Sequence, residues 1–146
     1  MSSCTFFGHT DTPKEIEPIL RSTLIELIEK QNVHLFFVGN HGCFDQMVTN
    51  TLNTLKNQYP EIQFYIVLAY LPTEKQIETN KTDTVFPEGI ECVPKRFAIV
   101  WRNQWMIDRS DFVITFVQRD FGGAATFQKK AAKKGKRIIN LAERCK

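Results

Sequence analysis

The stretch FVITFVQRDFGGAATFQ, at positions 112–128, decides the fold of this chain. Its first six residues are aromatic or β-branched, a run that is typical of a strand buried on both faces. Gly122 and Gly123 follow, and a helical pattern begins directly after them. A strand that runs through a glycine turn into a helix places free backbone N–H groups and the positive end of a helix dipole at one point. The stretch therefore predicts a phosphate-binding turn in an α/β fold.

The rest of the chain alternates in the same way between short apolar runs and amphipathic helical spacing. Besides 112–117, strands are expected at 4–8, 33–38, 62–69 and 137–140. Helices are expected at about 13–30 and 44–58, from about 94 onward, and at about 123–134. Strands that alternate with helices pair in parallel through right-handed crossovers. We therefore expect a three-layer α/β sandwich around a five-stranded, mainly parallel sheet.

Length and composition limit the class of protein. With 146 residues, 42% of them hydrophobic and 24% charged, the chain is expected to form a single globular domain over 1–146. No apolar run approaches the ~20 residues of a membrane helix, so no membrane partner is expected. The four cysteines are scattered without metal-binding spacing, which favours reduced thiols in the cytoplasm and predicts no metal site. A net charge of +3 is too small to indicate a nucleic-acid partner by itself.

One segment, 70–95, breaks the alternation. It contains three prolines, many polar residues and no sustained period, so a long loop is expected there. Loops of this length in compact domains are often lids or binding loops, and otherwise they are surface excursions. The sequence leaves open whether this loop closes over a ligand.

Three glycine turns follow predicted strands, and they contain Gly8, Gly39 with Gly42, and Gly122 with Gly123. In parallel sheets, ligands bind beyond the carboxyl ends of the strands, where the strand order switches direction. The three turns are therefore expected to meet at one site. None of them forms a Gly-x-Gly-x-x-Gly fingerprint or a Walker P-loop. An ordinary NAD enzyme and a P-loop ATPase are thus excluded, and no cofactor is expected.

Four short segments carry a family resemblance. They are FGH at 7–9, GNHGCFD at 39–45, RNQWM at 102–106 and GGAAT at 122–126. Together they resemble the SLOG superfamily of Rossmann-like nucleotide-binding proteins, which includes the LOG phosphoribohydrolases and proteins related to DprA. The resemblance runs from about residue 4 to residue 141, and it is closest to small stand-alone bacterial members. It implies a Rossmann-like form of the sandwich and a nucleotide-like ligand.

The resemblance also implies which residues are altered. LOG enzymes release a base from a nucleoside 5′-monophosphate with an Arg-Lys pair and a Gly-Gly-x-Gly-Thr-x-Glu turn. This chain keeps Arg102, but it has Asn103 in place of the lysine and Gln128 in place of the glutamate. A glutamine can hydrogen-bond a ribose hydroxyl but cannot act as a general base. The phosphate half of the site is expected to survive and the hydrolytic half to be impaired, with Arg102 and Asp45 as the catalytic candidates.

The expected ligand-binding residues belong to the glycine turns and to the segment before the strand at 112–117. They are Gly8, His9, Gly39, Asn40, His41, Gly42, Asp45, Arg102, Asn103, Gly122, Gly123, Ala124, Thr126 and Gln128. Structural alternatives stay open for several of them. An aspartate near a helix start is usually a cap, a loop histidine is usually solvated, and an arginine on a helix often lies at the surface.

These observations favour a cytoplasmic protein that binds a nucleotide or a nucleotide-derived small molecule, as a sensor or a sequestering module. Enzymatic activity stays open, because the alternative is a nucleotide N-glycosidase or phosphoribohydrolase of the LOG kind. A further alternative is DNA binding as in the DprA branch. The lysine run at 129–137 would carry it, although such runs are usually solvated helix faces. Trp101 and Trp105, one helical turn apart, fit either the core or a homodimer contact.

Overall fold

The fold is described from a computed structural model of the chain, which describes residues 2–69 and 84–144. In this part of the chain, six parallel strands form one sheet in the order β4-β3-β2-β1-β5-β6. The strands are β1 (Ser2–Gly8), β2 (Val33–Val38), β3 (Gln63–Val67), β4 (Thr84–Val85), β5 (Phe112–Phe116) and β6 (Arg137–Asn140).

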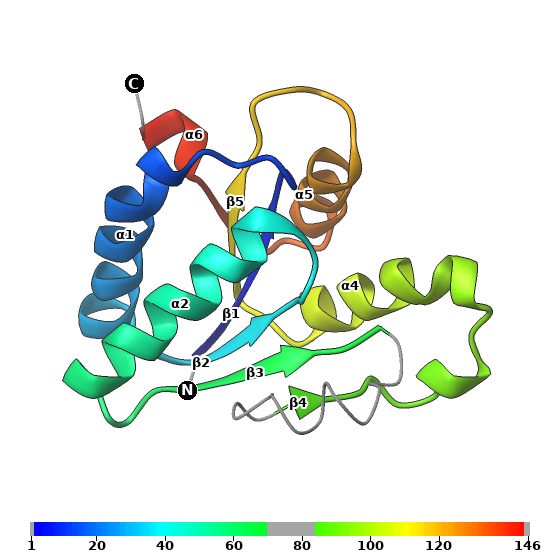
Figure 1. The fold of residues 1–146 in the computed structure, drawn as a ribbon, viewed down its shortest axis with the longest axis horizontal. Coiled ribbons are helices and arrows are strands. Elements are labelled where there is room, and N and C mark those ends of the chain that lie inside the picture. Colours follow the sequence, from blue (N-terminus) through cyan, green and yellow to red (C-terminus); the bar gives the residue numbers. More distant parts are fainter. Residues whose placement is uncertain (1, 70–83, 145–146) are drawn as a thin grey trace.

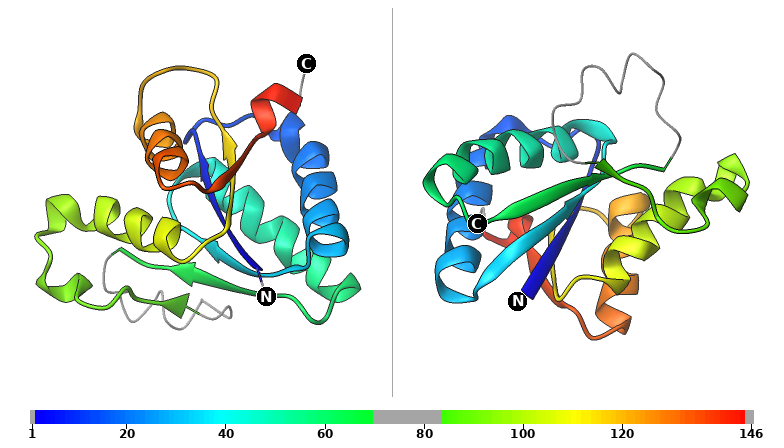
Figure 2. Two further views of the ribbon diagram at one scale, coloured as in Figure 1. Left: turned by 180° about the vertical axis from the view of Figure 1, so that it is seen from behind. Right: turned by 90° about the horizontal axis from the view of Figure 1, so that it is seen from below.

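Helices cover both faces of the sheet and complete three layers (Figures 1 and 2). On one face lie α1 (Glu17–Lys30), α2 (Gly42–Gln58) and α6 (Leu141–Arg144). On the other face lie α4 (Ala98–Asp108) and α5 (Gly123–Lys133). Short 3₁₀ turns are η1 (Lys14–Ile16), η2 (Ile90–Cys92) and η3 (Lys95–Phe97). None of the helices in the described part of the chain has the length and apolar character needed to cross a bilayer.

The position of β1 and β5 in the middle of the sheet explains why the sequences of these two strands are almost continuously apolar. All five residues of β5 are buried. In β1, Cys4 and Phe6 pack into the core under α1 and α2, whereas Phe7 points to the opposite face. There its ring stacks on Phe127 of α5, with 5.4 Å between the ring centroids. Successive side chains of a strand alternate between faces, so a strand covered by helices on both sides must be apolar throughout.

The α/β sandwich and the parallel sheet are confirmed, but the expected number of five strands is wrong. The sixth strand, β4, lies inside the segment that was expected to be a loop, and it pairs with β3 through Ile66 and Thr84. A strand of two residues at the edge of a sheet has no periodic pattern that a sequence could reveal. The η2 turn also lies within 70–95. Positions 70–83, and with them the question of a lid, fall outside the described residues.

The strand order reverses between β1 and β5, which lie side by side in the middle of the sheet. From the end of β1 the chain leaves toward α1 on one face, and from the end of β5 it leaves toward α5 on the other face (Figure 1). This divergence is a topological switch point, the place where open α/β sheets bind their ligands. The loops 9–13 and 117–122 border it.

Gly8 ends β1 at this edge, and it allows α2 to approach closely. A Cβ atom at Gly8 would lie 2.3 Å from Cγ of Phe44, a fully buried residue of α2. We expect Gly8→Ala to lower the free energy of unfolding by roughly 1–3 kcal/mol, because the ring has no room to move away. Urea denaturation measures this loss. Gly123→Ala is the matched control, since no atom lies within 4 Å of its added Cβ. A Gly8→Ala variant as stable as that control would contradict the packing.

Candidate functional site

A pocket of about 360 Å³ opens at the switch point, beyond the ends of β1 and β5. Its walls come from the loop after β1, the first turn of α2, one face of α4, and the junction between the 117–122 loop and α5. Nine of the fourteen residues expected from the sequence line it: Gly8, His9, His41, Asp45, Arg102, Asn103, Gly122, Gly123 and Ala124. The structure thus brings together residues from four separate segments of the chain.

Arg102 is the most unusual residue of the pocket, because its side chain is charged and only 3% exposed. Its Nε donates to Oδ1 of Asn103 at 3.0 Å, and its Nη1 donates to Oδ1 of Asn40 at 2.8 Å. Nη1 also lies 3.4 Å from the carbonyl oxygen of Val67, at the end of β3. Arg102 is therefore not a surface arginine, which was the structural alternative that its helical spacing had left open. These acceptors hold a buried cation in a fixed orientation at the pocket wall.

Asp45 lies in the first turn of α2 and has two roles in the structure. Its Oδ2 accepts a hydrogen bond from the backbone N–H of His41 at 3.0 Å, so the capping role is observed. The carboxylate also lines the pocket. Burial raises the pKa of Asp45 to about 6, and the N–H of His41 and the charge of Arg102 only partly oppose this effect. A carboxyl group that titrates near neutrality inside a pocket is typical of functional sites.

Gly39 explains how Arg102 and Asp45 come close together. A Cβ atom at this position would lie 2.7 Å from Oδ2 of Asp45 and 3.3 Å from Cζ of Arg102. Only a residue without a side chain leaves room for both groups. Gly39 and Asn40 do not line the pocket themselves. They support its wall because Gly39 lies against Asp45 and Arg102, and Asn40 accepts a hydrogen bond from Arg102. Gly42 is also outside the lining, and it adopts a positive φ of 93° next to Thr10.

The first turn of α5 forms the opposite wall. Gly122 has a φ of 94°, a conformation that favours glycine, and it starts α5 without any side-chain cap. Gly123 and Ala124 line the pocket, and no atom lies within 4 Å of a Cβ built on Gly123. The N–H groups of a first helical turn have no partner within the helix. This turn is therefore open to an anion from the pocket.

Two residues expected to bind the ligand face elsewhere. The hydroxyl of Thr126 donates to the carbonyl oxygen of Gly122 at 3.0 Å, within α5. The Oε1 atom of Gln128 accepts a hydrogen bond from the hydroxyl of Thr115, a fully buried residue of β5. Neither Thr126 nor Gln128 lines the pocket. The position where LOG enzymes carry a glutamate is thus used here to join α5 to the sheet.

The loop that leads into α5 is held from two sides. The N–H of Val117 donates to Oδ1 of Asn140 in β6, and Nδ2 of Asn140 donates to the carbonyl oxygen of Val117, both at 3.0 Å. On the other side, Nε2 of His9 accepts from the N–H of Gln118 at 3.0 Å. Burial, with a smaller contribution from Arg119, lowers the pKa of His9, which favours the neutral imidazole that this bond needs. His9 therefore positions the loop.

Arg119 is a pocket residue that the sequence did not indicate. Its Nη2 pairs with Oδ1 of Asp11 at 3.1 Å, which joins the loops that follow β5 and β1. Its guanidinium also lies 5.5 Å from the ring centroid of Phe121. The side chain is 42% exposed and remains accessible from the pocket. The only sequence signal was its place three positions before Gly122, the first residue of the glycine turn.

Other features named from the sequence do not contribute to the pocket. In the lysine run, Lys130 lies over the ring of Phe127, and Lys134 pairs with Asp108. Trp105 packs edge-on against Phe37, whereas Trp101 is 46% exposed. Within residues 2–69 and 84–144, no three His, Cys, Asp or Glu side chains form a group that could hold a metal ion.

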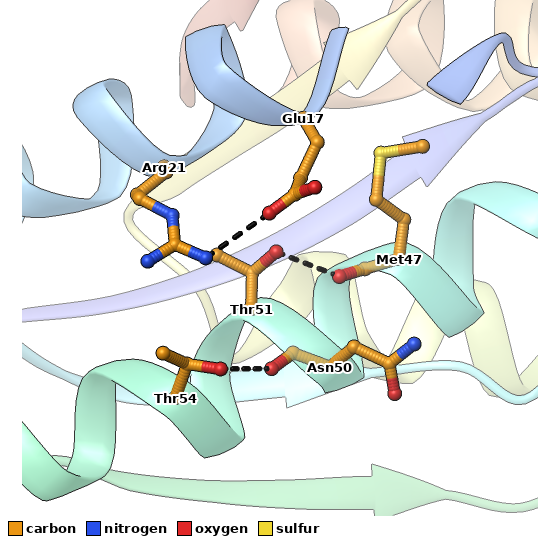
Figure 3. Close-up of polar contacts among 6 residues, drawn as sticks. All are labelled: Glu17, Arg21, Met47, Asn50, Thr51 and Thr54. Carbon is orange, nitrogen blue, oxygen red and sulfur yellow. Dashed lines mark hydrogen bonds and ion pairs between the residues drawn. The ribbon is translucent and has the colours of Figure 1, made fainter. Parts of the chain in front are cut away.

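A second hollow, of about 380 Å³, lies between α1 and α2 (Figure 3). None of the residues expected to bind a ligand lines it. Two of its three charged groups, Glu17 and Arg21, pair with each other at 3.0 Å. The hydroxyls of Thr51 and Thr54 donate to carbonyl oxygens one turn earlier in α2. These polar groups are satisfied by their own helices, so the hollow does not indicate a ligand.

The sequence profile of the YspA SLOG family matches residues 4–142. The chain belongs to this family. The resemblance to the SLOG superfamily that four short segments indicated is thereby confirmed. In this SLOG protein, the segments at 7–9, 39–45, 102–106 and 122–126 all contribute residues to the switch-point pocket.

Among solved structures, this SLOG protein is similar to DNA processing protein A (DprA) from Streptococcus pneumoniae. The two chains share 14% sequence identity with a TM-score of 0.67, over 94% of this chain and 49% of that chain. At this identity the likeness shows a common Rossmann-like fold, and this chain spans about half the length of the other. A comparison with curated proteins gives no match.

Proposed function

We propose that this SLOG protein binds a nucleotide or a nucleotide-derived small molecule in the switch-point pocket, with a phosphate group on the first turn of α5. One observation carries the proposal: the buried guanidinium of Arg102 and the uncapped start of α5 line the same pocket. Both attract anions, and Arg119 adds a further positive charge at the rim. The volume of about 360 Å³ falls within the range of small-molecule sites.

Binding without turnover, as a sensor or a sequestering module, is favoured by the position of Gln128. This side chain cannot serve as a general base, and it is engaged with Thr115 away from the pocket. The lysine run, which would carry DNA binding, is outside the pocket, and three of its charges, those of Lys130, Lys134 and Arg137, are engaged within the fold.

A second candidate function, an N-glycosidase of the LOG kind, is favoured by one specific observation. Asp45 supplies a carboxyl group inside the pocket, near Arg102, and its pKa of about 6 suits a general acid or base at neutral pH. Incubation with nucleoside 5′-monophosphates, followed by chromatography for free base, tests this activity. Release that is lost in Asp45→Asn would establish an enzyme. No release at any pH from 5 to 8 would leave binding as the function.

Thermal unfolding with added nucleotides tests the binding proposal. The screen uses nucleoside mono- and diphosphates, cyclic nucleotides, ADP-ribose and NAD. A ligand at ~100 times its dissociation constant should stabilise the protein by about 2.7 kcal/mol. We expect Gly123→Asp to weaken binding at least tenfold, because its carboxylate occupies the phosphate position and repels the ligand. The added side chain meets no protein atom within 4 Å at its Cβ, so the variant should fold.

Gly123→Ala is the matched control for this experiment. It adds the same Cβ without a charge, and we expect it to bind within about threefold of the wild type, well inside the 1.4 kcal/mol of a tenfold change. Equal binding by Gly123→Asp and the wild type would place the phosphate elsewhere. If none of the nucleotides stabilises the wild-type protein, the proposed function is wrong.

A further inference from the structure

We infer that the nucleobase of the ligand stacks on the exposed ring of Phe121, so that the pocket recognises a nucleotide with an intact base and discriminates against a bare sugar phosphate. This inference rests on the proposed function, and it adds the ligand class and the residue that selects it. It follows from the exposure of Phe121, from its neighbours in the chain, and from the way its loop is held.

Phe121 is 69% exposed, the largest exposed fraction among the large apolar side chains that the structure describes. It stands between two residues of the pocket lining, since Arg119 precedes it by two positions and Gly122 follows it directly. The ring is not itself part of the pocket lining, but it lies beside it, because the guanidinium of the lining residue Arg119 is 5.5 Å from the ring centroid. A chain segment of two residues is at most about 7 Å long. The phosphate turn is therefore close enough to the ring for a single ribose to join a 5′-phosphate on the turn to a base on the ring.

The loop presents this ring in a defined place. The Arg119 guanidinium lies over the Phe121 ring, 5.5 Å from its centroid, and Asp11 holds Arg119 in an ion pair of 3.1 Å. At the start of the same loop, the N–H of Val117 donates a hydrogen bond to Asn140, and the N–H of Gln118 donates one to His9. No aromatic side chain in the described part of the chain stacks on Phe121. A base that stacks there would bury apolar surface and would also lie near a cation.

The aromatic side chains inside the pocket offer no comparable surface. Phe7 and Phe127 line it, but they stack on each other with 5.4 Å between centroids and are each 6% exposed. Phe6 is 1% exposed and belongs to the core under α1 and α2. These three rings therefore expose almost no surface to a ligand. Among the aromatic rings in or beside the pocket in the described part of the chain, Phe121 has the largest exposed fraction.

The test compares two probes that differ only in the base, adenosine 5′-monophosphate and ribose 5-phosphate. Titration calorimetry is done with the wild type, Phe121→Ala and Phe97→Ala. Phe97 is the matched control, because it is 50% exposed and also covered by an arginine, but its partner Arg96 does not line the pocket, whereas Arg119 does. We expect Phe121→Ala to weaken adenosine 5′-monophosphate roughly 5- to 100-fold and to leave ribose 5-phosphate within twofold. Phe97→Ala should change neither affinity.

Each other result overturns the inference in a recognisable way. Equal loss of both probes in Phe121→Ala would mean that Phe121 positions the loop without touching the base. Unchanged binding of both probes would place the base elsewhere. Wild-type protein that binds ribose 5-phosphate as tightly as adenosine 5′-monophosphate would leave the phosphate site intact and remove the base-stacking role. Only a wild-type protein that binds neither these probes nor other nucleotides would also contradict the proposed function.

Discussion

Replacement of Arg102 by methionine is expected to lower the free energy of unfolding by about 3–5 kcal/mol and to abolish nucleotide binding. Methionine fills a similar volume, but it donates no hydrogen bond. Oδ1 of Asn103, Oδ1 of Asn40 and the carbonyl oxygen of Val67 would all lose a donor. The neighbouring carboxylate of Asp45 would lose the cation beside it. Removal of one member of such a buried charged network typically lowers the free energy of unfolding by about 3–5 kcal/mol.

Chemical denaturation of the apo protein measures this loss, and calorimetry with the best nucleotide ligand measures binding. Arg96→Met is the control, because Arg96 is an exposed arginine that precedes the same helix and lies over Phe97. It should unfold within about 0.5 kcal/mol of the wild type. Arg102→Lys keeps the charge without the forked geometry of the guanidinium. Its free energy of unfolding should fall between those of Arg102→Met and Arg96→Met. Full stability in Arg102→Met would show that the guanidinium carries no structural role.

Asp45→Asn is expected to change how stability depends on pH. The folded protein raises the pKa of Asp45 from 3.8 to about 6, so its carboxyl group binds a proton more tightly in the folded state than in the unfolded state. Protonation therefore favours folding. Stability should fall as the pH rises from about 4 to about 6, and it should level off above that range. The loss amounts to about 3 kcal/mol, at 1.36 kcal/mol per pKa unit.

Other carboxylates also titrate in this range, so the informative quantity is the difference between the wild type and Asp45→Asn. Asparagine keeps an acceptor for the N–H of His41 and cannot ionise. The variant should approach the wild type near pH 4 and exceed it in stability at pH 7. Asp120→Asn removes an exposed carboxylate and should follow the wild type throughout. A constant difference between Asp45→Asn and the wild type from pH 4 to 7 would contradict the raised pKa.

Much of the fold follows from local sequence pattern. The runs at 33–38 and 112–117 are apolar apart from His34 and Thr115, which is typical of strands in a sheet covered on both faces. Glycine turns that follow parallel strands meet at one edge of the sheet. The meeting of four segments at one pocket was predictable for this reason. β4 was not, because two residues at a sheet edge have no pattern of their own.

Side-chain direction was the part that the sequence could not supply. Arg102 shared a helical face with apolar residues, which is equally consistent with a surface arginine and a buried one. The family resemblance put Gln128 among the ligand-binding residues, whereas in the structure its side chain bonds to Thr115 on β5. The bond between His9 and Gln118 joins residues 109 positions apart. Contacts of this kind depend on the assembled fold, so no local pattern indicates them.

The paired hydrogen bonds between Asn140 and Val117 have a consequence for when the binding loop becomes ordered during folding. Val117 begins the loop that carries the proposed phosphate turn, yet its partner belongs to β6, 23 positions later in the sequence. β6 joins the sheet beside β5 and is the outermost strand on that side. A folding chain in which 137–140 has not yet joined the sheet would keep the bond between His9 and Gln118 but would lack the anchor of the loop on the β6 side. Full affinity for the ligand would then require β6 in place, so that ligand binding would report on the docking of this edge strand.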